Sequence, residues 1–382
     1  IFFRIAMSDT SPVRIGILST ANIAKKNVAA IKAAKGCALG PVASRDAARA
    51  EQFAAAYGPT RSLGSYEELL EDAETDALYV PLPTSLHDEW VPKAAAKGKH
   101  VLCEKPVAVT AGRLHAMLQA CKGAGVAFMD GVMFMHHDRL SVMRKKLDEG
   151  ILGTAGPRTV TSTFTFRGDQ DFLSGNIRCK PDMDPLGCCG DLGWYNVRLS
   201  LWAFGYQLPV DARAVLHAAT PDGVPLTLSG TLTWPEDDFD KNPPAEMGAT
   251  GPRMATFFCS FLHALQQTCQ IHGDTGVMEL DDFVIPFNPE QASFKVTRHG
   301  IMDDAKRISR DCEIFDVKDS VQEVQMWERF AEVVCGADGS FWTYVSMATQ
   351  LCMDALLQSA REGGKAVPID PEGLLSHYSY KK

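Results

Sequence analysis

Short apolar segments alternate with helical segments over the first third of the chain, and this alternation limits the possible folds more than any other feature. Each apolar run is rich in β-branched residues and is followed by a stretch with helical spacing. Such alternation predicts β-α-β units, and therefore a parallel sheet with right-handed crossovers. The predicted strands are 13–18, 37–43, 77–81, 100–103 and 127–129, and the predicted helices are 23–34, 47–57, 66–71, 87–97 and 113–123.

The pattern changes after about residue 150, where strand-like segments follow one another without regular helices between them. This arrangement predicts an α+β domain with a large open, mainly antiparallel sheet, covered by helices on one face. The acidic, Pro- and Gly-rich stretch from Pro235 to Gly251 is predicted to be a mobile surface loop. The predicted strands are 159–167, 226–234, 254–262, 268–272, 276–280 and 293–296, and the predicted helices are 194–202, 321–334 and 347–361.

Composition excludes several classes of partner. The chain has 382 residues and a net charge of −9, with its Lys and Arg residues scattered. This balance argues against nucleic acid and anionic membranes as partners. No apolar stretch approaches the roughly 20 residues needed to cross a bilayer. Residues 1–6 precede Met7, which resembles a natural start, so we interpret them as an appended segment or the tail of a processed leader.

The eleven cysteines do not form a pattern typical of disulfides. Their number is odd, no CxxC pair occurs, and most lie in apolar segments (Cys37, Cys103, Cys121, Cys259, Cys335 and Cys352). Buried free thiols in a reducing compartment, the cytoplasm or the plastid stroma, are therefore expected. The neighbouring pair Cys188 and Cys189 is interpreted as two small apolar residues in preference to a redox pair.

The turn after the first strand has the spacing of a dinucleotide-binding loop with its glycines replaced. Ser19, Ala21 and Ala24 stand where the fingerprint has glycines, and small residues still permit a tight turn. We predict that Ser19, Ala21, Asn22 and Ile23 bind a cofactor, although an ordinary strand-to-helix turn is an equal alternative from this segment alone. The flexible N-terminal segment then covers residues 1–12, and a Rossmann dinucleotide-binding domain covers 13–135.

The residues at the end of the second strand indicate which dinucleotide is bound. It carries Ser44 and Arg45 where an NAD-binding unit has an acidic residue. A hydroxyl and a guanidinium suit a 2′-phosphate, whereas a carboxylate repels one. NADP is therefore predicted over NAD.

The third predicted strand, 77–81, ends in a segment that is predicted to form a rigid loop. Leu82, Pro83 and Thr84 follow a strand and are predicted to lie near the nicotinamide half of the cofactor. His87 opens the next helix, and a cofactor contact or a local structural role are equal alternatives for it.

Residues 100–106 read His-Val-Leu-Cys-Glu-Lys-Pro, so an apolar strand stops at a Glu-Lys pair. Pro106 cannot donate to a ladder and keeps Lys105 out of helix geometry. The carboxyl end of a parallel strand is where open α/β folds bind ligands. Lys105 is therefore a candidate catalytic residue in preference to a solvated strand end, and Glu104 is predicted to position the loop near the cofactor.

These segments together resemble the Gfo/Idh/MocA oxidoreductases, the family of glucose-fructose oxidoreductase and inositol dehydrogenase. The resemblance runs from about Val13 to the last helix and is closest to NADP-dependent D-xylose dehydrogenases and trans-dihydrodiol dehydrogenases. Within that branch, the sequence is most similar to plant and algal members. It departs from the family where Cys188 and Cys189 replace two residues of a glycine run. The matching segments are 16–24, 42–45, 81–87, 96–106, 129–137 and 187–195.

The resemblance implies a Rossmann domain followed by a substrate-binding and oligomerisation domain, here 136–382, and a homodimer or higher homo-oligomer formed through its sheet. Within it, Lys105 supplies positive charge, Tyr195 exchanges the substrate proton, and Asp191 orients Lys105 or holds a hydroxyl. Plain packing of Tyr195 and capping by Asp191 are the structural alternatives. A lysine beside Tyr195 is expected to bring the pKa of the phenol toward working pH.

His137 and Arg178 are predicted on the substrate side, and no metal is predicted because His136 and His137 lack a third ligand at a sensible spacing. The predicted activity is NADP-dependent hydride transfer to or from a small polyhydroxylated substrate, an aldose or a cyclic diol. The alternatives are a reductase of another carbonyl or conjugated metabolite and an NADP-binding sensor without turnover.

Overall fold

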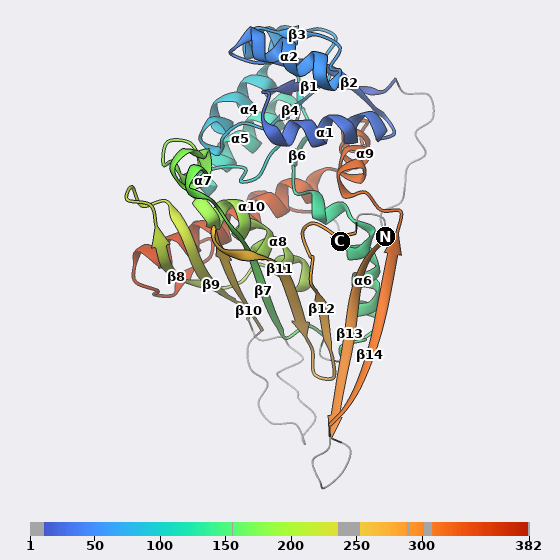
Figure 1. Ribbon diagram of the computed structural model, residues 1–382, viewed down its shortest axis with the longest axis vertical. Helices are drawn as coiled ribbons and strands as arrows, with labels where there is room; N and C mark the ends of the chain where they lie inside the picture. Colours follow the sequence, from blue (N-terminus) through green and yellow to red (C-terminus); the bar gives the residue numbers. More distant parts are fainter. Residues whose placement is uncertain (1–10, 155, 236–252, 289–290, 302–307, 381–382) are drawn as a thin grey trace.

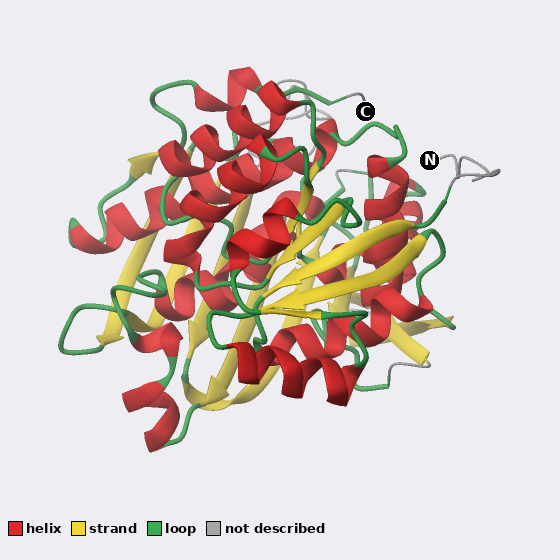
Figure 2. Ribbon diagram, turned by 90° about the horizontal axis from the view of Figure 1, so that it is seen from above, coloured by secondary structure: helices red, strands yellow, loops and turns green. Residues whose placement is uncertain are grey.

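The computed structural model describes residues 11–154, 156–235, 253–288, 291–301 and 308–380, and it contains two sheets (Figure 1). The first sheet is parallel throughout, with the strand order β3-β2-β1-β4-β5-β6 and helices on both sides (Figure 2). This order is that of a doubly wound nucleotide-binding fold, whose switch point lies between β1 and β4. Its strands are β1 (Val13–Leu18), β2 (Cys37–Ala43), β3 (Ser62–Leu63), β4 (Ala77–Val80), β5 (His100–Cys103) and β6 (Phe128–Asp130).

Helices α1 to α5 connect these strands, and three of them begin at a capping side chain. Side chains of Asp46, Ser65 and Thr110 cap α2, α3 and α5 by accepting a hydrogen bond from a backbone N–H in the first turn. The helices are α1 (Asn22–Ala33), α2 (Ala47–Tyr57), α3 (Tyr66–Glu71), α4 (His87–Ala96) and α5 (Ala111–Ala124).

The second sheet has nine strands in the order β14-β13-β12-β11-β7-β10-β9-β8-β15. Among the described strands of this second sheet, only β7 and β10 pair in parallel, so the sheet is mainly antiparallel, as predicted. Its strands are β7 (Thr159–Arg167), β8 (Asp211–Ala219), β9 (Pro225–Thr233), β10 (Met254–Ser260), β11 (Leu262–His272), β12 (Val277–Leu280), β13 (Gln291–Ile301), β14 (Ile308–Lys318) and β15 (Val367–Pro368).

Helices cover this sheet on one face, which agrees with the prediction. The other face carries exposed apolar side chains, including Val215 on β8 and Ile314 on β14. The helices of this part are α6 (Asp138–Asp148), α7 (Gln170–Gly175), α8 (Trp194–Ala203), α9 (Gln322–Val334) and α10 (Ser340–Arg361).

Most predicted elements are present within two residues of their predicted ends, but several were missed. The elements that were not predicted are β3, β8, β14, β15, α6 and α7. β13 extends well beyond the predicted 293–296, and β11 and α10 begin at Leu262 and Ser340 where 268 and 347 were predicted. The predicted loop from Pro235 to Gly251 falls almost wholly on 236–252, and most of the predicted flexible segment falls on 1–10. Both ranges lie outside the described residues.

The C-terminal helices return to the parallel sheet. Trp327 and Phe330 of α9 are buried in one core with Ile15, Ile17 and Tyr79 of the parallel strands. A fully buried ion pair between Arg198 of α8 and Asp130 of β6 makes a second connection. The two halves of the chain are therefore joined through buried polar and apolar contacts.

All eleven cysteines are free thiols. Cys188 and Cys189 are fully buried, and burial raises the pKa of both thiols, which fits two small packed residues. The expectation that the thiols are buried is wrong for Cys312 of β14 and for Cys335 at the end of α9, which are both exposed. No helix within the described part of the chain is long and apolar enough to span a bilayer.

Candidate active site

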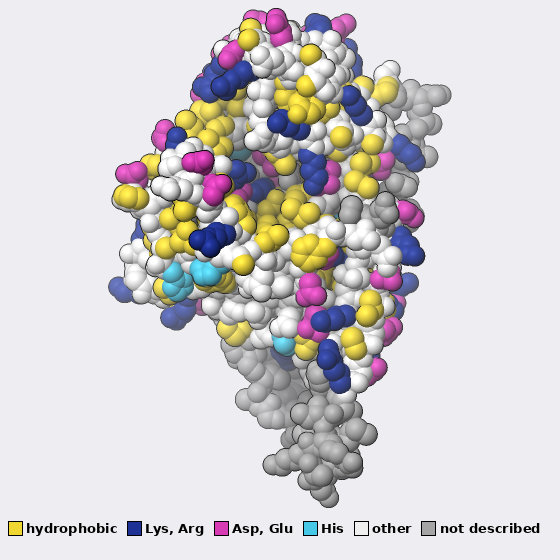
Figure 3. Space-filling view, viewed as in Figure 1, with side chains coloured by type: hydrophobic (Ala, Val, Ile, Leu, Met, Phe, Trp, Pro, Cys, Tyr) yellow, Lys and Arg dark blue, Asp and Glu magenta, His cyan; other side chains and the backbone are white. Residues whose placement is uncertain are grey.

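A cavity of about 780 Å³ lies at the carboxyl ends of β1, β4 and β5, where the parallel sheet faces the second half of the chain. Figure 3 shows a hollow between the two parts of the molecule, with hydrophobic side chains beside it. Its inner end is lined by Lys105, Asp191, Tyr195 and Arg178. The site is therefore shared between segments about 90 residues apart in the sequence.

Lys105 follows β5 directly and points across to the second half of the chain. Its Nζ donates to the backbone carbonyl of Asp191 at 2.8 Å and to Oδ1 of the same residue at 2.7 Å. The same ammonium lies 4.7 Å from the centre of the Tyr195 ring. Burial opposes its charge, but the Asp191 carboxylate outweighs that effect, so the pKa of Lys105 lies above its usual value.

Asp191 joins two cations. Its Oδ1 also lies 2.9 Å from Nε of Arg178, and its side chain is only 12% exposed. Burial works to raise the pKa of this carboxyl, but Arg178 and Lys105 together hold it well below its usual range. Asp191 is therefore a fixed anion that orients Lys105, and Arg178 lies beside it at the cavity wall.

Asp191 and Tyr195 are brought together by an unusual turn. A π-helix, Cys189–Gly193, runs directly into α8, so helical backbone begins before Asp191 and not at the predicted residue 194. π-helical turns of this kind are frequent at functional sites. Gly190 packs directly on Pro106, because a Cβ at this position would lie 2.7 Å from Cγ of the proline. The Lys105–Pro106 peptide bond is cis.

The tyrosine is less acidic than expected. Burial raises the pKa of Tyr195 to about 12; Lys105 lowers it, but Glu104 and Asp191 work in the same direction as burial. The expectation that Lys105 would bring this pKa toward working pH is therefore wrong for this structure. Tyr195 is a neutral phenol near pH 7, and its hydroxyl contacts the sulfur of Met133 at 3.4 Å.

Glu104 lies where it can position the loop that carries Lys105. It accepts a hydrogen bond from the hydroxyl of Tyr79 at 2.5 Å and another from the backbone N–H of Lys105 at 3.2 Å. Tyr79 in turn accepts from the side chain of Asn27 at 2.7 Å. Burial raises the pKa of the Glu104 carboxyl. This chain of bonds fixes the backbone from which Lys105 projects.

The turn after β1 keeps a glycine-like backbone without glycine. Ser19 has φ = 140°, a value that side chains rarely adopt, and its hydroxyl accepts from the N–H of Ala21 at 3.0 Å. Unlike α2, α3 and α5, the described first turn of α1 has neither a side-chain cap nor an acidic residue. Its free N–H groups, at Asn22 and Ile23, suit a phosphate.

The predicted 2′-phosphate residues lie at the same edge of the sheet. Ser44 follows β2 and is buried, with its hydroxyl accepting from the N–H of Asp46 at 3.2 Å. Arg45 is exposed. Burial raises the pKa of the Tyr66 phenol, and hydrogen bonds of its hydroxyl with Arg45 and Ser19 oppose that increase. Tyr66 was not predicted, because it lies on the separate helix α3 and no motif marks it.

The loop after β4 divides into cavity and scaffold residues. Leu82 and Thr84 line the cavity, and Pro83 lies between them. Thr84 donates to the buried carboxylate of Asp184 in the second half of the chain. Burial raises the pKa of Asp184, which also lines the cavity and was not predicted.

His87 has the structural role among its two alternatives. It is fully buried, and its ring nitrogens each lie 2.9 Å from a backbone carbonyl oxygen, of Val107 and of Leu82. It does not line the cavity. His87 thus holds the loop after β4 against the segment that follows Pro106, which fits the local structural role among its two alternatives.

His137 is also placed away from the cavity. Its Nδ1 accepts from the N–H of Arg139 at the start of α6, and burial lowers its pKa to about 4. His137 does not line the cavity, and its contact with the substrate stays a prediction. No group of three or more metal-binding side chains occurs in the described parts of the chain.

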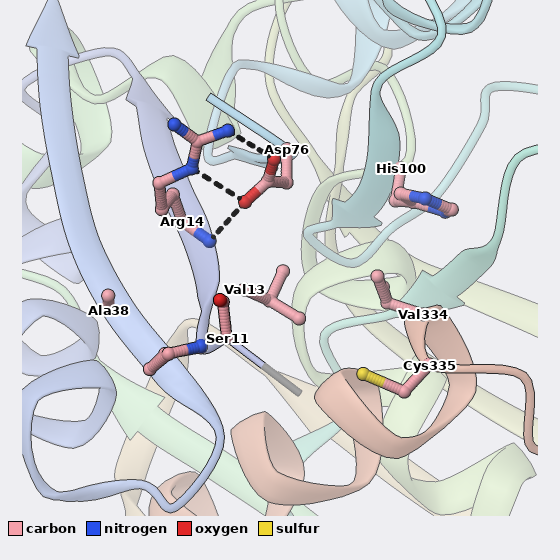
Figure 4. Close-up of a pocket in the computed structure, with 9 residues that line it drawn as sticks. Ser11, Val13, Arg14, Ala38, Asp76, His100, Val334 and Cys335 are labelled. Carbon is pink, nitrogen blue, oxygen red and sulfur yellow. Dashed lines mark hydrogen bonds and ion pairs between the residues drawn. The ribbon is translucent and has the colours of Figure 1, made fainter. Parts of the chain in front are cut away.

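A second cavity, of about 740 Å³, lies at the opposite edge of the parallel sheet (Figure 4). Arg14 and Asp76 form a bidentate ion pair in its wall, and both side chains are more than one-third exposed. The amino ends of parallel strands are not where such sheets bind ligands. We assign the chemistry to the cavity at Lys105.

The fold and site define the class of the protein: a two-part oxidoreductase with a nucleotide-binding sheet and a lysine, aspartate and tyrosine at the junction. The chain matches the model described as oxidoreductase family, NAD-binding Rossmann fold, over residues 13–132, and that of the GFO/IDH/MocA C-terminal domain over residues 141–279. The chain belongs to the GFO/IDH/MocA oxidoreductase family.

Two relatives and one solved structure illustrate the likeness. D-xylose 1-dehydrogenase (NADP(+)) 2 from Haloferax volcanii is 37% identical over 57% of this chain and 65% of the relative, just under two thirds of its length. dTDP-3,4-didehydro-2,6-dideoxy-alpha-D-glucose 3-reductase from Saccharopolyspora spinosa is 30% identical over 78% of this chain and 84% of the relative. A 3-ketoreductase from Actinomadura kijaniata, solved with NADP and TDP-benzene, superposes with a TM-score of 0.77 at 26% identity, over 91% of this chain and 98% of the other.

Proposed function

We propose that this protein is an NADP-dependent oxidoreductase that transfers a hydride between the nicotinamide and a carbinol or carbonyl carbon of a small polyhydroxylated substrate, an aldose or a cyclic diol. The observation that carries the proposal is the position of the Lys105 ammonium, between Asp191 and the Tyr195 ring at the base of the cavity. The relatives named above, a xylose dehydrogenase and sugar ketoreductases, support the substrate class.

Each side chain of the site has a step to perform. The Lys105 ammonium stabilises negative charge that develops on the reacting oxygen, since a fixed cation in a buried site acts strongly on such charge. Asp191 holds that ammonium, Arg178 holds the Asp191 carboxylate, and both side chains bind neighbouring hydroxyl groups. Tyr195, as a neutral phenol, donates the proton to the oxygen during reduction, and its tyrosinate accepts the proton during oxidation. When bound, the cofactor would accept the hydride in its oxidised form, NADP+, and donate it in its reduced form, NADPH.

The residues of the first three strand ends fit NADP better than NAD. The uncapped first turn of α1, with Ala21, Asn22 and Ile23, holds the pyrophosphate. Ser19, Ser44 and Arg45 hold the 2′-phosphate, with no carboxylate in the place where an NAD-binding unit has one. Leu82, Pro83 and Thr84 lie beside the nicotinamide, and Glu104 fixes the backbone at Lys105.

We expect the cofactor and the substrate to be bound by different domains. Residues 13–135 bind the cofactor and 136–382 bind the substrate, with α9 returning to cover the cofactor domain. The open face of the nine-stranded sheet, with its exposed apolar side chains, is the surface through which we expect the chain to form a homodimer or higher homo-oligomer. The free thiols fit the reducing environment of the cytoplasm or plastid stroma.

Substitution of the catalytic pair tests this function. Lys105→Met and Tyr195→Phe should each reduce kcat for NADP-linked oxidation by at least about a hundredfold, because each removes a group that acts on the reacting oxygen. NADPH binding, followed by the fluorescence of the nicotinamide, should remain measurable in both variants. Full turnover in either variant would refute the assignment, and NADPH binding by wild-type protein without turnover of any sugar or diol would favour a sensor.

The cofactor assignment has its own test. Arg45→Ala should raise the Kd for NADP by about tenfold or more and leave the Kd for NAD within about twofold, because only NADP carries the 2′-phosphate that a guanidinium binds. Arg49→Ala, on the exposed side of α2, is the matched control. Equal changes in the two dissociation constants would remove Arg45 from the phosphate site.

A further inference from the structure

The outer wall of the cavity at Lys105 is apolar although solvent reaches it. Leu265 is 62% exposed, Ile285 is 45% exposed and Ile177 is 38% exposed, and all three line the cavity together with Phe166. Exposed apolar side chains that gather at a cavity mouth mark a binding surface. The inner end, by contrast, presents Lys105 and charged partners. The cavity is thus polar at the reacting end and apolar toward its mouth.

The wall is built to stay in place. The side-chain amide of Gln267, which is 3% exposed, donates to the carbonyl of Ile285 at 2.7 Å and accepts from the N–H of Ile285 at 2.8 Å. These two bonds hold the segment after β12 onto β11. An exposed isoleucine fixed by a buried amide is held ready for contact, which lowers the entropy lost on binding.

The neighbouring parts of the wall are fixed as well. The pairing of β11 with β7 is irregular between Leu262 and Gln266, and the hydroxyl of Thr165 donates to the carbonyl of Ala264 at 2.6 Å within that irregularity. Bulges next to active sites redirect side chains, here that of Leu265. Phe166 is held edge-on by Phe172, with ring centres 5.2 Å apart.

The charges of the lining argue against a diphosphate-linked substrate. The cations among the described lining residues are Lys26, Lys105 and Arg178, and each forms an ion pair with a carboxylate. A diphosphate at the mouth would need a cation that is not already paired. The wall therefore suits an uncharged apolar group better than a nucleotide.

We propose that the wall formed by Phe166, Ile177, Leu265 and Ile285 is a subsite for an apolar, aromatic substituent, so that the preferred substrates are polyhydroxylated rings that carry such a group, as aryl glycosides do. This inference rests on the proposed function and specifies its substrate class. The hydroxylated ring lies at Lys105 and Tyr195, and the substituent lies against the wall. Oxidation then converts a ring carbinol into a ketone as NADP is reduced and one proton is released.

Binding measurements test the subsite without relying on turnover. Calorimetric titration of the NADP-saturated protein should give a Kd for phenyl β-D-glucopyranoside about tenfold or more below that for methyl β-D-glucopyranoside, with the same ordering for the xylopyranosides, because the phenyl ring buries apolar surface that the methyl group lacks. Equal affinities, or no measurable binding of either phenyl glycoside, would overturn the subsite. Lys105→Met should keep the phenyl preference, so that loss of turnover in this variant tests the chemistry separately.

Two surface substitutions locate the effect. Leu265→Ser and Ile285→Ser should each reduce the phenyl-over-methyl ratio to about threefold or less, whereas Ile314→Ser, at an equally exposed apolar position on β14, should leave it unchanged. An unchanged ratio in both wall variants would refute the subsite. A shift of their sedimentation coefficient with an unchanged ratio would refute it too, because the wall would then be a contact between copies of the chain.

Discussion

The proton-exchanging residue has an environment that separates the two directions of the reaction. Tyr195 is buried between Lys105 and two carboxylates, and burial raises the pKa of its phenol to about 12. Lys105 itself stays charged because of its ion pair with Asp191. At neutral pH the site therefore holds the acid form needed for reduction and lacks most of the base form needed for oxidation.

This environment predicts a pH dependence. The tyrosinate fraction rises about tenfold per pH unit below the pKa, so kcat/KM for oxidation should rise with nearly that slope between about pH 7 and pH 10, while kcat/KM for reduction stays nearly constant there. Initial rates in both directions, with saturating cofactor, provide the measurement. The residual oxidation by Tyr195→Phe should lose the slope; a slope that persists in this variant would assign the proton to another group.

At the scale of elements, the packing of the turn before α8 explains which of its positions require glycine. Gly187 has φ = 54° and its position has no room for a Cβ, while Cys188 and Cys189 have inward-facing side chains that are fully buried. The replacement of two glycines by cysteines is thus accommodated by packing. Gly190 remains because Leu186 and Pro106 close on it from two sides.

Gly190→Ala should damage the site through this contact. Its Cβ would lie 2.5 Å from Cβ of Leu186 and 2.7 Å from Cγ of Pro106, so either the turn or the segment at Lys105 must shift. We expect a loss of about 1–3 kcal/mol in the free energy of unfolding and about tenfold or more in kcat. Gly193→Ala is the control, because its nearest neighbour, Sγ of Cys259, lies at 3.4 Å. Equal effects in the two variants would contradict this account.

Elements with a regular pattern could be predicted, and those without one could not. The parallel strands are buried on both faces and stand out as apolar runs, whereas β8 and β14 expose much of one face and have no comparable run. Lys105 was predicted from its position at the end of a strand, whereas Asp191 and Tyr195 were predicted from the family resemblance. Asp184 and Tyr66 could not be found, because their partners Thr84 and Ser19 lie far away in the sequence and only the fold brings them together.

For the molecule as a whole, the C-terminal half reaches the catalytic strand through a buried line of hydrogen bonds. Trp327 of α9 donates to the side chain of Asn27 at 2.8 Å, and Asn27 donates to Tyr79 at 2.7 Å. Tyr79 donates to Glu104, which receives the N–H of Lys105. A residue about 220 positions further along the chain therefore contributes to the placement of the catalytic ammonium.

Asn27→Leu should break this line at its centre. The indole N–H of Trp327 would remain buried without its acceptor, and the hydroxyl of Tyr79 would lose its donor, at a cost of about 2–4 kcal/mol in the free energy of unfolding. Urea denaturation measures this loss, with Ala29→Leu on the exposed side of α1 as the control for helix packing. We also expect kcat to fall about tenfold, since the line of bonds ends at Lys105. The Kd for NADP should change less than about threefold, because Asn27 contacts the phosphate turn only at the carbonyl oxygen of Ile23 and not at the N–H groups that face a phosphate. Asn27→Leu with wild-type kcat would show that Glu104 alone suffices to hold the lysine in place.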